Sequence, residues 1–285
     1  MTGCAADADD VVQTTFQRAI ERLPADDRPA RPWLIKVAVN ASRDVLRARR
    51  RRQYTGPWLP TPVEDLPVVE LGPEAQYDAR ESASLAFLAA LEALPPKRRA
   101  VLILRDVMDY SVEETADALE MSASNVKTTH HRARRALQTY DGGPRQVDLA
   151  DAHAETISAF LAALATRDIA QVEALLAEDV RMVNDGGGVF VAALRPVHGR
   201  RKVRDFLLGV TAQVDPATAW FDIRTLNAVP CLLSDAPSTK PRTARTSVLS
   251  LALDSQGRVS SLHVLINPAK LTRVSFRSAA AGQIR

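Results

Sequence analysis

The segment LPPKRRAVLILRDVMDYSVEETADALEMSASNVKTTHHRARRALQ, residues 94–138, decides the fold of the N-terminal half of the chain. The i, i+3, i+4, i+7 spacing of apolar side chains predicts a short helix with one buried face, formed by Val112, Thr115, Ala116 and Leu119. Met121 ends this helix, and Ser122 can cap the next one because its hydroxyl accepts a free backbone N–H. Two helices joined by so short a connection predict a helix-turn-helix.

The second helix of this segment, Ser122 to Gln138, has a buried and an outward side. Val126, Ala133 and Leu137 form the buried side. The outward side carries residue types that reach base edges and phosphates in a DNA major groove, namely Ser124, Asn125, Lys127, Thr128, His131, Arg132 and Arg135. Residues 106–120 hold six acidic residues and no Lys or Arg, whereas residues 122–138 hold no acid, so a polyanion would favour the second helix. The alternative is an ordinary helical hairpin with a solvated basic face.

Composition limits the class of protein. The 285 residues carry a net charge of +3, and this charge is unevenly distributed along the chain. Residues 1–53 have a net charge of +4, residues 54–80 of −4 and residues 148–285 of +3. The positive N-terminal block favours nucleic acid as a partner. Cys4 and Cys231 are far apart, which indicates neither a disulfide framework nor a zinc site, and we expect no metal or cofactor. No apolar run is long enough to span a membrane, and we expect a cytoplasmic protein without a membrane partner.

Two amphipathic helices are predicted before the helix-turn-helix. The first, residues 7–23, has an apolar stripe of Val12, Phe16, Ala19 and Leu23. The second, residues 32–52, begins at Pro32, has an inner stripe of Leu34, Val37, Ala38, Ala41 and Val45, and ends in a run of arginines. Such a run is typical of a helix end that follows the phosphate backbone of DNA, although it is also compatible with a merely solvated helix end.

The rest of the chain divides at two breaks. Residues 54–80 form an acidic linker with five prolines, and residues 82–94 and 97–107 supply two more helices. After Asp141–Pro144 we expect three helices, one of which runs from Asp168 to Ala177, and five strands, at 180–183, 220–226, 228–233, 246–253 and 261–266. Helices followed by strands predict an α+β domain with helices on one face of an antiparallel sheet.

With these residues in view, the chain resembles the extracytoplasmic-function sigma factors of bacterial RNA polymerase. Residues 7–23 resemble the helix that docks on the polymerase, which implies polymerase-binding roles for Asp10, Gln13 and Phe16. Residues 32–52 resemble the helix that reads and opens the −10 promoter element, and the implied DNA-binding residues are Trp33, Asn40, Arg47 and Arg50. Residues 94–138 resemble the part that reads the −35 element. For Trp33 and Asn40, packing roles remain as alternatives.

Three further motifs resemble a subgroup with a fused C-terminal SnoaL-like domain. They are Trp58-Leu59-Pro60-Thr61-Pro62 in the linker, Asp185-Gly186-Gly187-Gly188, and Asn267-Pro268-Ala269-Lys270-Leu271. The resemblance implies a multidomain protein with a sigma-2-like part (1–53), a linker (54–80), a sigma-4-like helix-turn-helix part (81–141) and an α+β SnoaL-like cone (148–275). It departs from the pattern at the start, where Met1 stands six residues before Asp7 and a usual preceding helix is missing. A start codon assigned too late and a real truncation both explain this. A sigma-2-like part without that helix would leave the apolar face of Val12, Phe16 and Leu23 partly uncovered.

The SnoaL-like domain raises an alternative function. Several relatives of this fold are enzymes, which use a carboxylate base and an acidic hydrogen-bond donor, often tyrosine. All four tyrosines here precede residue 148, so we expect no catalytic residues, and Asp185, Asp222, His198 and His263 remain as polar pocket candidates. The alternation of His263 with Leu262 and Val264 points its side chain to the pocket or to solvent. A SnoaL-like enzyme, or a sensor of an unidentified small ligand, with a vestigial DNA-binding head is the second hypothesis.

The favoured hypothesis is a sigma factor that binds core RNA polymerase and promoter DNA and is regulated by its own C-terminal domain, so that a separate anti-sigma factor is not required. A stiff, proline-framed apolar pair, Trp58 and Leu59, is unfavourable in water. We expect the C-terminal domain to pack against this part of the linker. The expected interface residues are Trp58, Leu59, Pro60, Asp185, Gly186, Asn267, Pro268 and Lys270.

Overall fold

The computed structural model describes residues 1–22, 29–51, 54–64, 85–137, 146–215, 217–238 and 240–276. Leu23, Arg52, the linker beyond residue 64 and the predicted break at 141–144 lie outside the described residues. The chain divides into two compact units: Met1–Gln53 with Phe87–Gly142, and Tyr54–Ala86 with Gly143–Arg285. The part expected to be sigma-2-like and most of the part expected to be sigma-4-like therefore share one unit, and the start of the linker belongs with the C-terminal domain.

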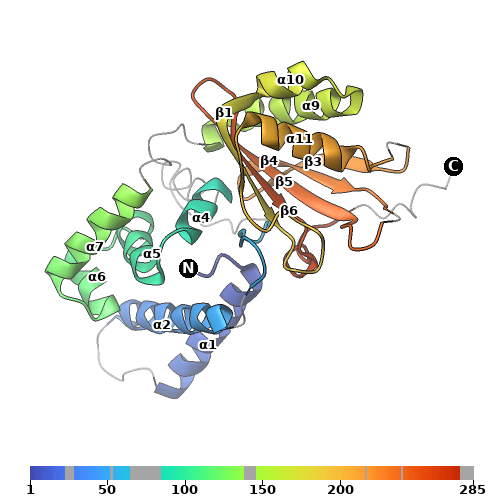
Figure 1. Cartoon of the computed structure of the whole chain (residues 1–285). Helices are drawn as coiled ribbons and strands as arrows, with labels where there is room; N and C mark the ends of the chain where they lie inside the picture. The colour runs from blue at the N-terminus through green and yellow to red at the C-terminus, as the bar shows by residue number, and fades with distance from the viewer. Residues whose placement is uncertain are drawn as a thin grey trace. The chain divides into compact units, whose positions relative to one another are not determined.

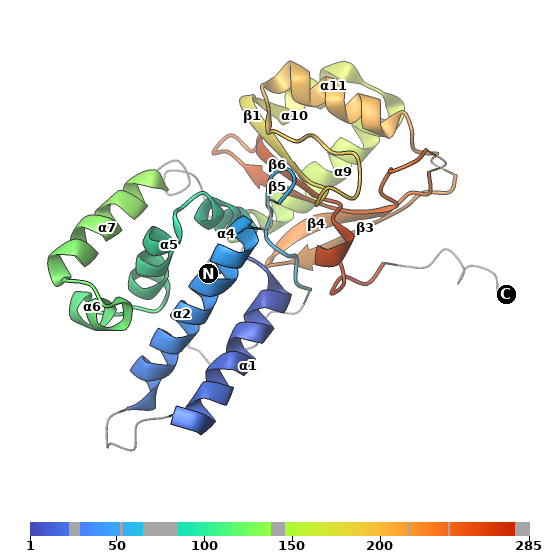
Figure 2. The same cartoon turned by 60° about the horizontal axis from the view of Figure 1, so that its bottom comes forward.

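The first unit is helical (Figures 1 and 2). Its first two helices, α1 (Ala5–Arg22) and α2 (Ala30–Arg51), pack side by side. On α1 the buried residues are Val11 and Thr15, whereas Val12 and Phe16 of the expected apolar stripe are exposed. On α2 the fully buried positions are Val39, Ala41, Ser42 and Leu46, so the core-facing stripe is rotated from the predicted one and shares only Ala41 with it.

The second half of this unit contains α4 (Leu85–Glu92), α5 (Pro96–Leu102), α6 (Val112–Leu119) and α7 (Ala123–Ala136). The single helix predicted for 97–107 changes character after Leu102. It continues as the π-helical turn η1 (Ile103–Val107), closed by a bond from the Met108 amide to the Ile103 carbonyl. The Tyr110 amide then bonds to the Leu104 carbonyl, which turns the chain toward α6.

The second unit has three helices on one face of a mixed sheet (Figure 1). The helices are α9 (Ala150–Thr166), α10 (Ile169–Leu175) and α11 (Arg200–Thr211), and short 3-10 turns lie at η2 (Gln146–Leu149) and η3 (Pro268–Lys270). The strands are β1 (Leu176–Asp185), β2 (Val197–His198), β3 (Trp220–Leu226), β4 (Val229–Asp235), β5 (Thr246–Leu253) and β6 (Val259–Leu265), in the order β2-β1-β6-β5-β4-β3.

Two predictions for this unit are wrong. The sheet is not wholly antiparallel, because β1 pairs with β6 in parallel while the other neighbours are antiparallel. The helix predicted to reach Ala177 ends at Leu175, since Leu176 and Ala177 open β1 and are buried in the core. The two-residue strand β2 was missed, because so short a segment has no periodic pattern.

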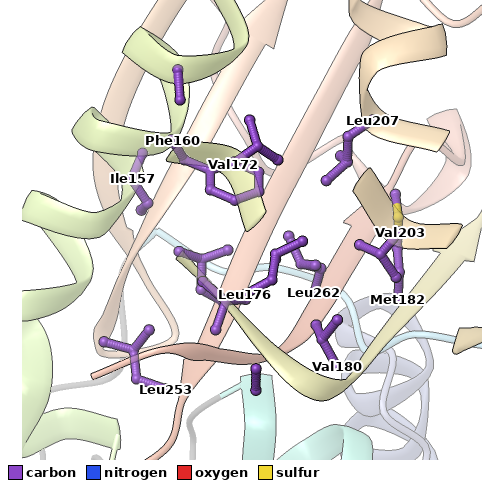
Figure 3. Packing of buried hydrophobic residues seen from close by; sticks show 14 of the residues in the cluster. Ile157, Phe160, Val172, Leu176, Val180, Met182, Val203, Leu207, Leu253 and Leu262 are labelled. Atoms are coloured by element: carbon purple, nitrogen blue, oxygen red, sulfur yellow. The ribbon is translucent and has the colours of Figure 1, made fainter. Parts of the chain in front are cut away.

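The sheet separates two apolar clusters. Between the sheet and the helices lie Phe160, Met182 and Leu262 with other fully buried side chains (Figure 3). The cluster on the opposite face contains Val248 and Leu265 of the sheet together with Leu59 of the linker. We call this opposite side the linker face.

Candidate functional site

The turn between α6 and α7 is shaped by its end groups. Ser111 and Glu114 form a reciprocal capping box at the start of α6. Glu120 takes a left-handed conformation that ends α6, and the Ser122 hydroxyl accepts the Asn125 amide at the start of α7. The predicted helix-turn-helix is confirmed, and Ala116 of α6 and Val126 of α7 pack together with Val101 of α5 in one buried cluster.

The outward side of α7 carries every side chain that the sequence placed there. All seven are exposed, namely Ser124, Asn125, Lys127, Thr128, His131, Arg132 and Arg135. Arg134, by contrast, makes an ion pair with Asp106 at 3.3 Å, and His130 contacts the same carboxylate at 2.6 Å. The exposed cations Lys127, Arg132 and Arg135 can therefore contact a polyanion, whereas Arg134 is paired with Asp106 of η1.

The α2 helix presents a second exposed polar stripe. Asn40, Arg47 and Arg50 are exposed, while Trp33 is half-buried. Arg47 pairs with Asp44 one turn earlier, at 2.7 Å. Arg49, which the sequence did not single out, pairs with Asp7 of α1 at 2.6 Å and so fastens the two helices together.

The free face of α1 is apolar in its centre. Val12, Phe16 and Ile20 are 52%, 59% and 88% exposed. The predicted polymerase-binding residues Asp10 and Gln13 are exposed as well. Contact of the apolar side chains Val12, Phe16 and Ile20 with water is unfavourable in free energy.

Within the first unit, α2 packs against the α6 region. Ile35 of α2 joins a cluster with Leu104 and Tyr110. At the edge of this contact Lys36 pairs with Glu120 at 2.7 Å, and the Arg31 guanidinium lies 5.6 Å from the Tyr110 ring centroid. We call this contact the α2–α6 seam, and the structure brings both candidate DNA-reading helices, α2 and α7, into one compact unit through it.

The second unit holds the linker through one buried carboxylate, Asp185. Its Oδ2 accepts the Leu59 amide at 2.8 Å and the Lys270 ammonium at 2.6 Å. Its Oδ1 accepts the Gly187 amide at 3.1 Å and the Tyr54 hydroxyl. A fully buried carboxylate needs this many donors, because desolvation without them strongly disfavours the charge.

Lys270 is the matching buried cation. Its side chain is 3% exposed, and its Nζ donates to the Leu59 carbonyl at 2.5 Å in addition to Asp185. The same Nζ lies 3.1 Å from the centroid of the Trp58 ring, within the range of a cation–π contact. Trp58 in turn meets the Tyr54 ring edge-on, with centroids 4.6 Å apart. The linker segment 54–63 and the residues that hold it are called the linker clamp below.

The glycines after Asp185 make room for the clamp. Gly187 has φ +58°, and a Cβ there would lie 2.4 Å from Nδ2 of Asn267. That Asn267 Nδ2 donates to the Tyr54 hydroxyl at 2.8 Å, while its Oδ1 accepts the Ala269 amide at the start of η3. Gly186 and Leu59 are also buried here, whereas Pro268 is exposed. The three motifs of the sequence therefore meet at one place.

A second anchor was missed by the sequence reasoning. The Val63 amide donates to Oδ1 of Asn227 at 2.9 Å, and the Asn227 amide donates back to the Val63 carbonyl at 2.9 Å. Glu64 accepts from Arg224 at 2.8 Å. Asn227 sits in the β3–β4 turn with φ +51°, so the only local signal is an asparagine suited to a left-handed turn.

The polar candidates of the C-terminal domain are dispersed. Asp222 pairs with Arg224 at 2.9 Å, and His198 is exposed on β2. His263 lies neither in a pocket under the helices nor in open solvent: it belongs to the linker face, where Leu59, Pro60 and Pro62 cover it. Burial lowers its pKa to about 4, with a smaller contribution from Arg181.

None of the described His, Cys, Asp and Glu side chains gather in a group of three that could hold a metal ion. Burial raises the pKa of the Cys231 thiol to about 12, so this thiol stays protonated and inert. No helix in the described part of the chain is long and apolar enough to cross a membrane.

Comparison with known proteins places both halves of the chain. Family models for "Sigma-70 region 2" and "Sigma-70, region 4" match residues 1–52 and 84–137. The ECF RNA polymerase sigma factor SigJ of Mycobacterium tuberculosis is 31% identical over 279 residues, covering 95% of this chain and 88% of that protein. SigG of the same species is 37% identical over 159 residues, but the match spans only 49% of this chain and 43% of SigG. The crystal structure of SigJ superposes with a TM-score of 0.74 at 28% identity, covering 97% of this chain and 93% of that one.

Proposed function

Since this chain belongs to the extracytoplasmic-function sigma factors of bacterial RNA polymerase, we propose that it reads promoters through α2 and α7 and that its C-terminal domain regulates it by holding the linker. The regulatory part of the proposal rests on the buried pair of Lys270 and Asp185. Asp185 accepts a hydrogen bond from the Leu59 amide, and Lys270 donates one to the Leu59 carbonyl.

The DNA-reading part of the proposal rests on two exposed polar faces. On α7 the exposed Lys127 and Arg132 suit phosphates, and Asn125 suits a base edge. On α2 the exposed Asn40, Arg47 and Arg50 extend along one helix, with the half-buried Trp33 at its start. Aromatic and amide groups beside cations are the means by which proteins trap unstacked bases.

The α2–α6 seam suggests that the first unit is a closed form. Promoter elements read by α2 and α7 are separated along the DNA, so one compact unit is unsuited to contacting both. Opening the seam would expose Ile35 and Tyr110 and would separate Lys36 from Glu120. This contact is small and partly polar, so we propose that binding to polymerase and DNA supplies the free energy that opens it.

The linker clamp gives the C-terminal domain a means of control within one chain. The clamped segment begins three residues after α2 ends at Arg51, at the start of the linker between α2 and the helix-turn-helix, and we propose that the closed clamp fixes how far α2 and α7 separate on DNA. In this proposal the partners are core RNA polymerase and promoter DNA in the bacterial cytoplasm. A separate anti-sigma factor is not required, because the regulatory contact is intramolecular.

The catalytic alternative has less support. The side of the sheet that faces the helices is filled by Phe160, Met182 and Leu262 with their neighbours (Figure 3). Asp185, the carboxylate that a base would need, is fully engaged by the linker clamp. We therefore assign the domain a binding role toward the linker.

Run-off transcription with core polymerase tests the proposal. The intact protein should direct initiation from its own promoter, and Trp58→Ala should change the yield because it removes the ring beneath Lys270. Phe221→Ala serves as the matched control, since Phe221 is an aromatic residue of the same domain that is 42% exposed and does not belong to the apolar cluster that contains Leu59 of the linker. Failure to associate with core polymerase at low salt would refute the sigma-factor role, and equal yields from all three proteins would refute the regulatory one.

A further inference from the structure

His263 is half-buried in a small site that linker residues line on one side. Its strand, β6, turns Leu262 toward the helices and His263 toward the linker face. The site is walled by Val248, Ser250 and Leu265 of the sheet, and it is covered by Leu59, Pro60 and Pro62 of the linker. Ser250 stands directly opposite His263 across the β5–β6 pair.

The two ring nitrogens of His263 have different surroundings. Nε2 lies 3.2 Å from the Ser261 hydroxyl. Nδ1 is buried, and among the described residues no group forms a hydrogen bond with it. A neutral imidazole tolerates this arrangement at some cost, whereas an imidazolium would bury a second N–H donor and a charge without an acceptor.

Among the described residues, the charged groups around this site offer no partner for an imidazolium. From β1, Arg181 opposes a positive charge, and Asp185 is committed to the clamp. From the linker, Tyr54 also bonds to Asp185, and Glu64 bonds to Arg224. The segment after β6 contributes the cations Lys270 and Arg273, and β5 contributes no titratable side chain.

We propose that His263 makes the linker clamp sensitive to acid: protonation of its imidazole releases residues 54–63 from the linker face. The inference rests on the proposed regulatory role of the clamp for its biological meaning, but the release itself is a property of the C-terminal unit. Removing the linker gives the imidazolium, and its buried Nδ1 in particular, fuller access to water.

The sign and size of the effect follow from the two states of the histidine. Burial under the linker lowers the pKa of His263 to about 4, and release returns it toward the ordinary value of 6.5. The closed clamp binds fewer protons, so it is most stable above pH 6.5 and weakens as the pH falls from 6.5 toward 4. Between pH 7.5 and pH 5 this linkage shifts the clamp equilibrium toward release by about 30-fold.

Fluorescence of Trp58 in the full chain measures the release. Trp33→Phe and Trp220→Phe leave Trp58 as the only tryptophan, and quenching by acrylamide then reports its exposure. Quenching should rise between pH 7.5 and pH 5. His263→Gln, which stays neutral and can keep a bond to Ser261, should abolish the rise, while His198→Gln on the exposed β2 should retain it.

Several outcomes would overturn the proposal. These are an unchanged quenching of Trp58 across this pH range, the same rise in His263→Gln as in the parent, and loss of hydrogen-exchange protection in β5 and β6 together with the linker. His263→Asn replaces the Gln variant if that protein does not fold. Because no polymerase is present, this result is independent of transcription, and a failed run-off assay would leave it standing.

Discussion

Replacing Lys270 by methionine probes the centre of the linker clamp. Methionine keeps an unbranched stem of similar length and removes only the cation. Lys270 is 3% exposed and its partner Asp185 is 0% exposed, so the substitution leaves a buried carboxylate without its counter-ion. The Leu59 carbonyl and the Trp58 ring lose their cation at the same time.

The expected effect is large for a single side chain. Breaking a buried pair by removing one partner costs about 3–5 kcal/mol. Asp185 keeps neutral donors from Tyr54, Leu59 and Gly187, so we expect the lower end, about 3 kcal/mol, which shifts the clamp toward release by roughly 150-fold. The released state is little affected, because there the carboxylate is hydrated.

Hydrogen exchange at the Leu59 and Val63 amides measures this shift. Both amides bond to side chains of the domain, Asp185 and Asn227, and both lose protection on release. Arg258→Met is the matched control, since its pair with Asp254 lies at 3.1 Å on the surface and should contribute at most about 1 kcal/mol. Protection in Lys270→Met equal to that in Arg258→Met would refute the argument.

Three further predictions concern the first unit. Ser122→Ala should lower the free energy of unfolding by about 1 kcal/mol, because it removes the cap of α7, while Ser124→Ala on the exposed face should change it little; thermal unfolding compares the two. Arg132→Ala should weaken DNA binding. If the side chain contacts phosphate, the dependence of log affinity on log salt concentration should fall by about one in slope; if it reads a base, binding at the cognate site alone should lose about 1–3 kcal/mol. Unchanged binding would show that α7 has only a structural role. Phe16→Ala should weaken association with core polymerase by about 2 kcal/mol, measured by titration with Gln17→Ala as the control, and equal affinities would exclude α1 from docking.

The N-terminal half could be predicted from the sequence because its signals are local. The spacing from Val112 to Leu119 and the Ser122 cap lie within one or two helical turns of each other, so they specify α6 and α7 without knowledge of the rest of the chain. The rotated stripe of α2 could not be obtained in this way. Its buried face is chosen by α1 and the α2–α6 seam, which are contacts with elements elsewhere in the chain.

The linker clamp was only partly predictable, because it too depends on contacts between distant parts of the chain. The three motifs indicated which segments meet, but the Asn227 and Arg224 anchor carries no motif and depends on a turn between two strands. The parallel pairing of β1 with β6 joins residues about eighty positions apart, which no periodicity reports. The alternation of His263 with Leu262 and Val264 predicted that the His263 side chain lies on the opposite face of the sheet from its two neighbours. It did not predict that Leu59, Pro60 and Pro62 lie against that face.

Run-off transcription on templates of stepped spacer length tests the central claim most directly. If the clamp fixes the separation of α2 and α7 on DNA, the intact protein should transcribe over a narrow range of spacers, because each base pair moves the two elements apart by about 3.4 Å. Lys270→Met should broaden that range, while Arg258→Met should leave it narrow. Identical spacer profiles for the three proteins would contradict the claim that the C-terminal domain acts through the linker.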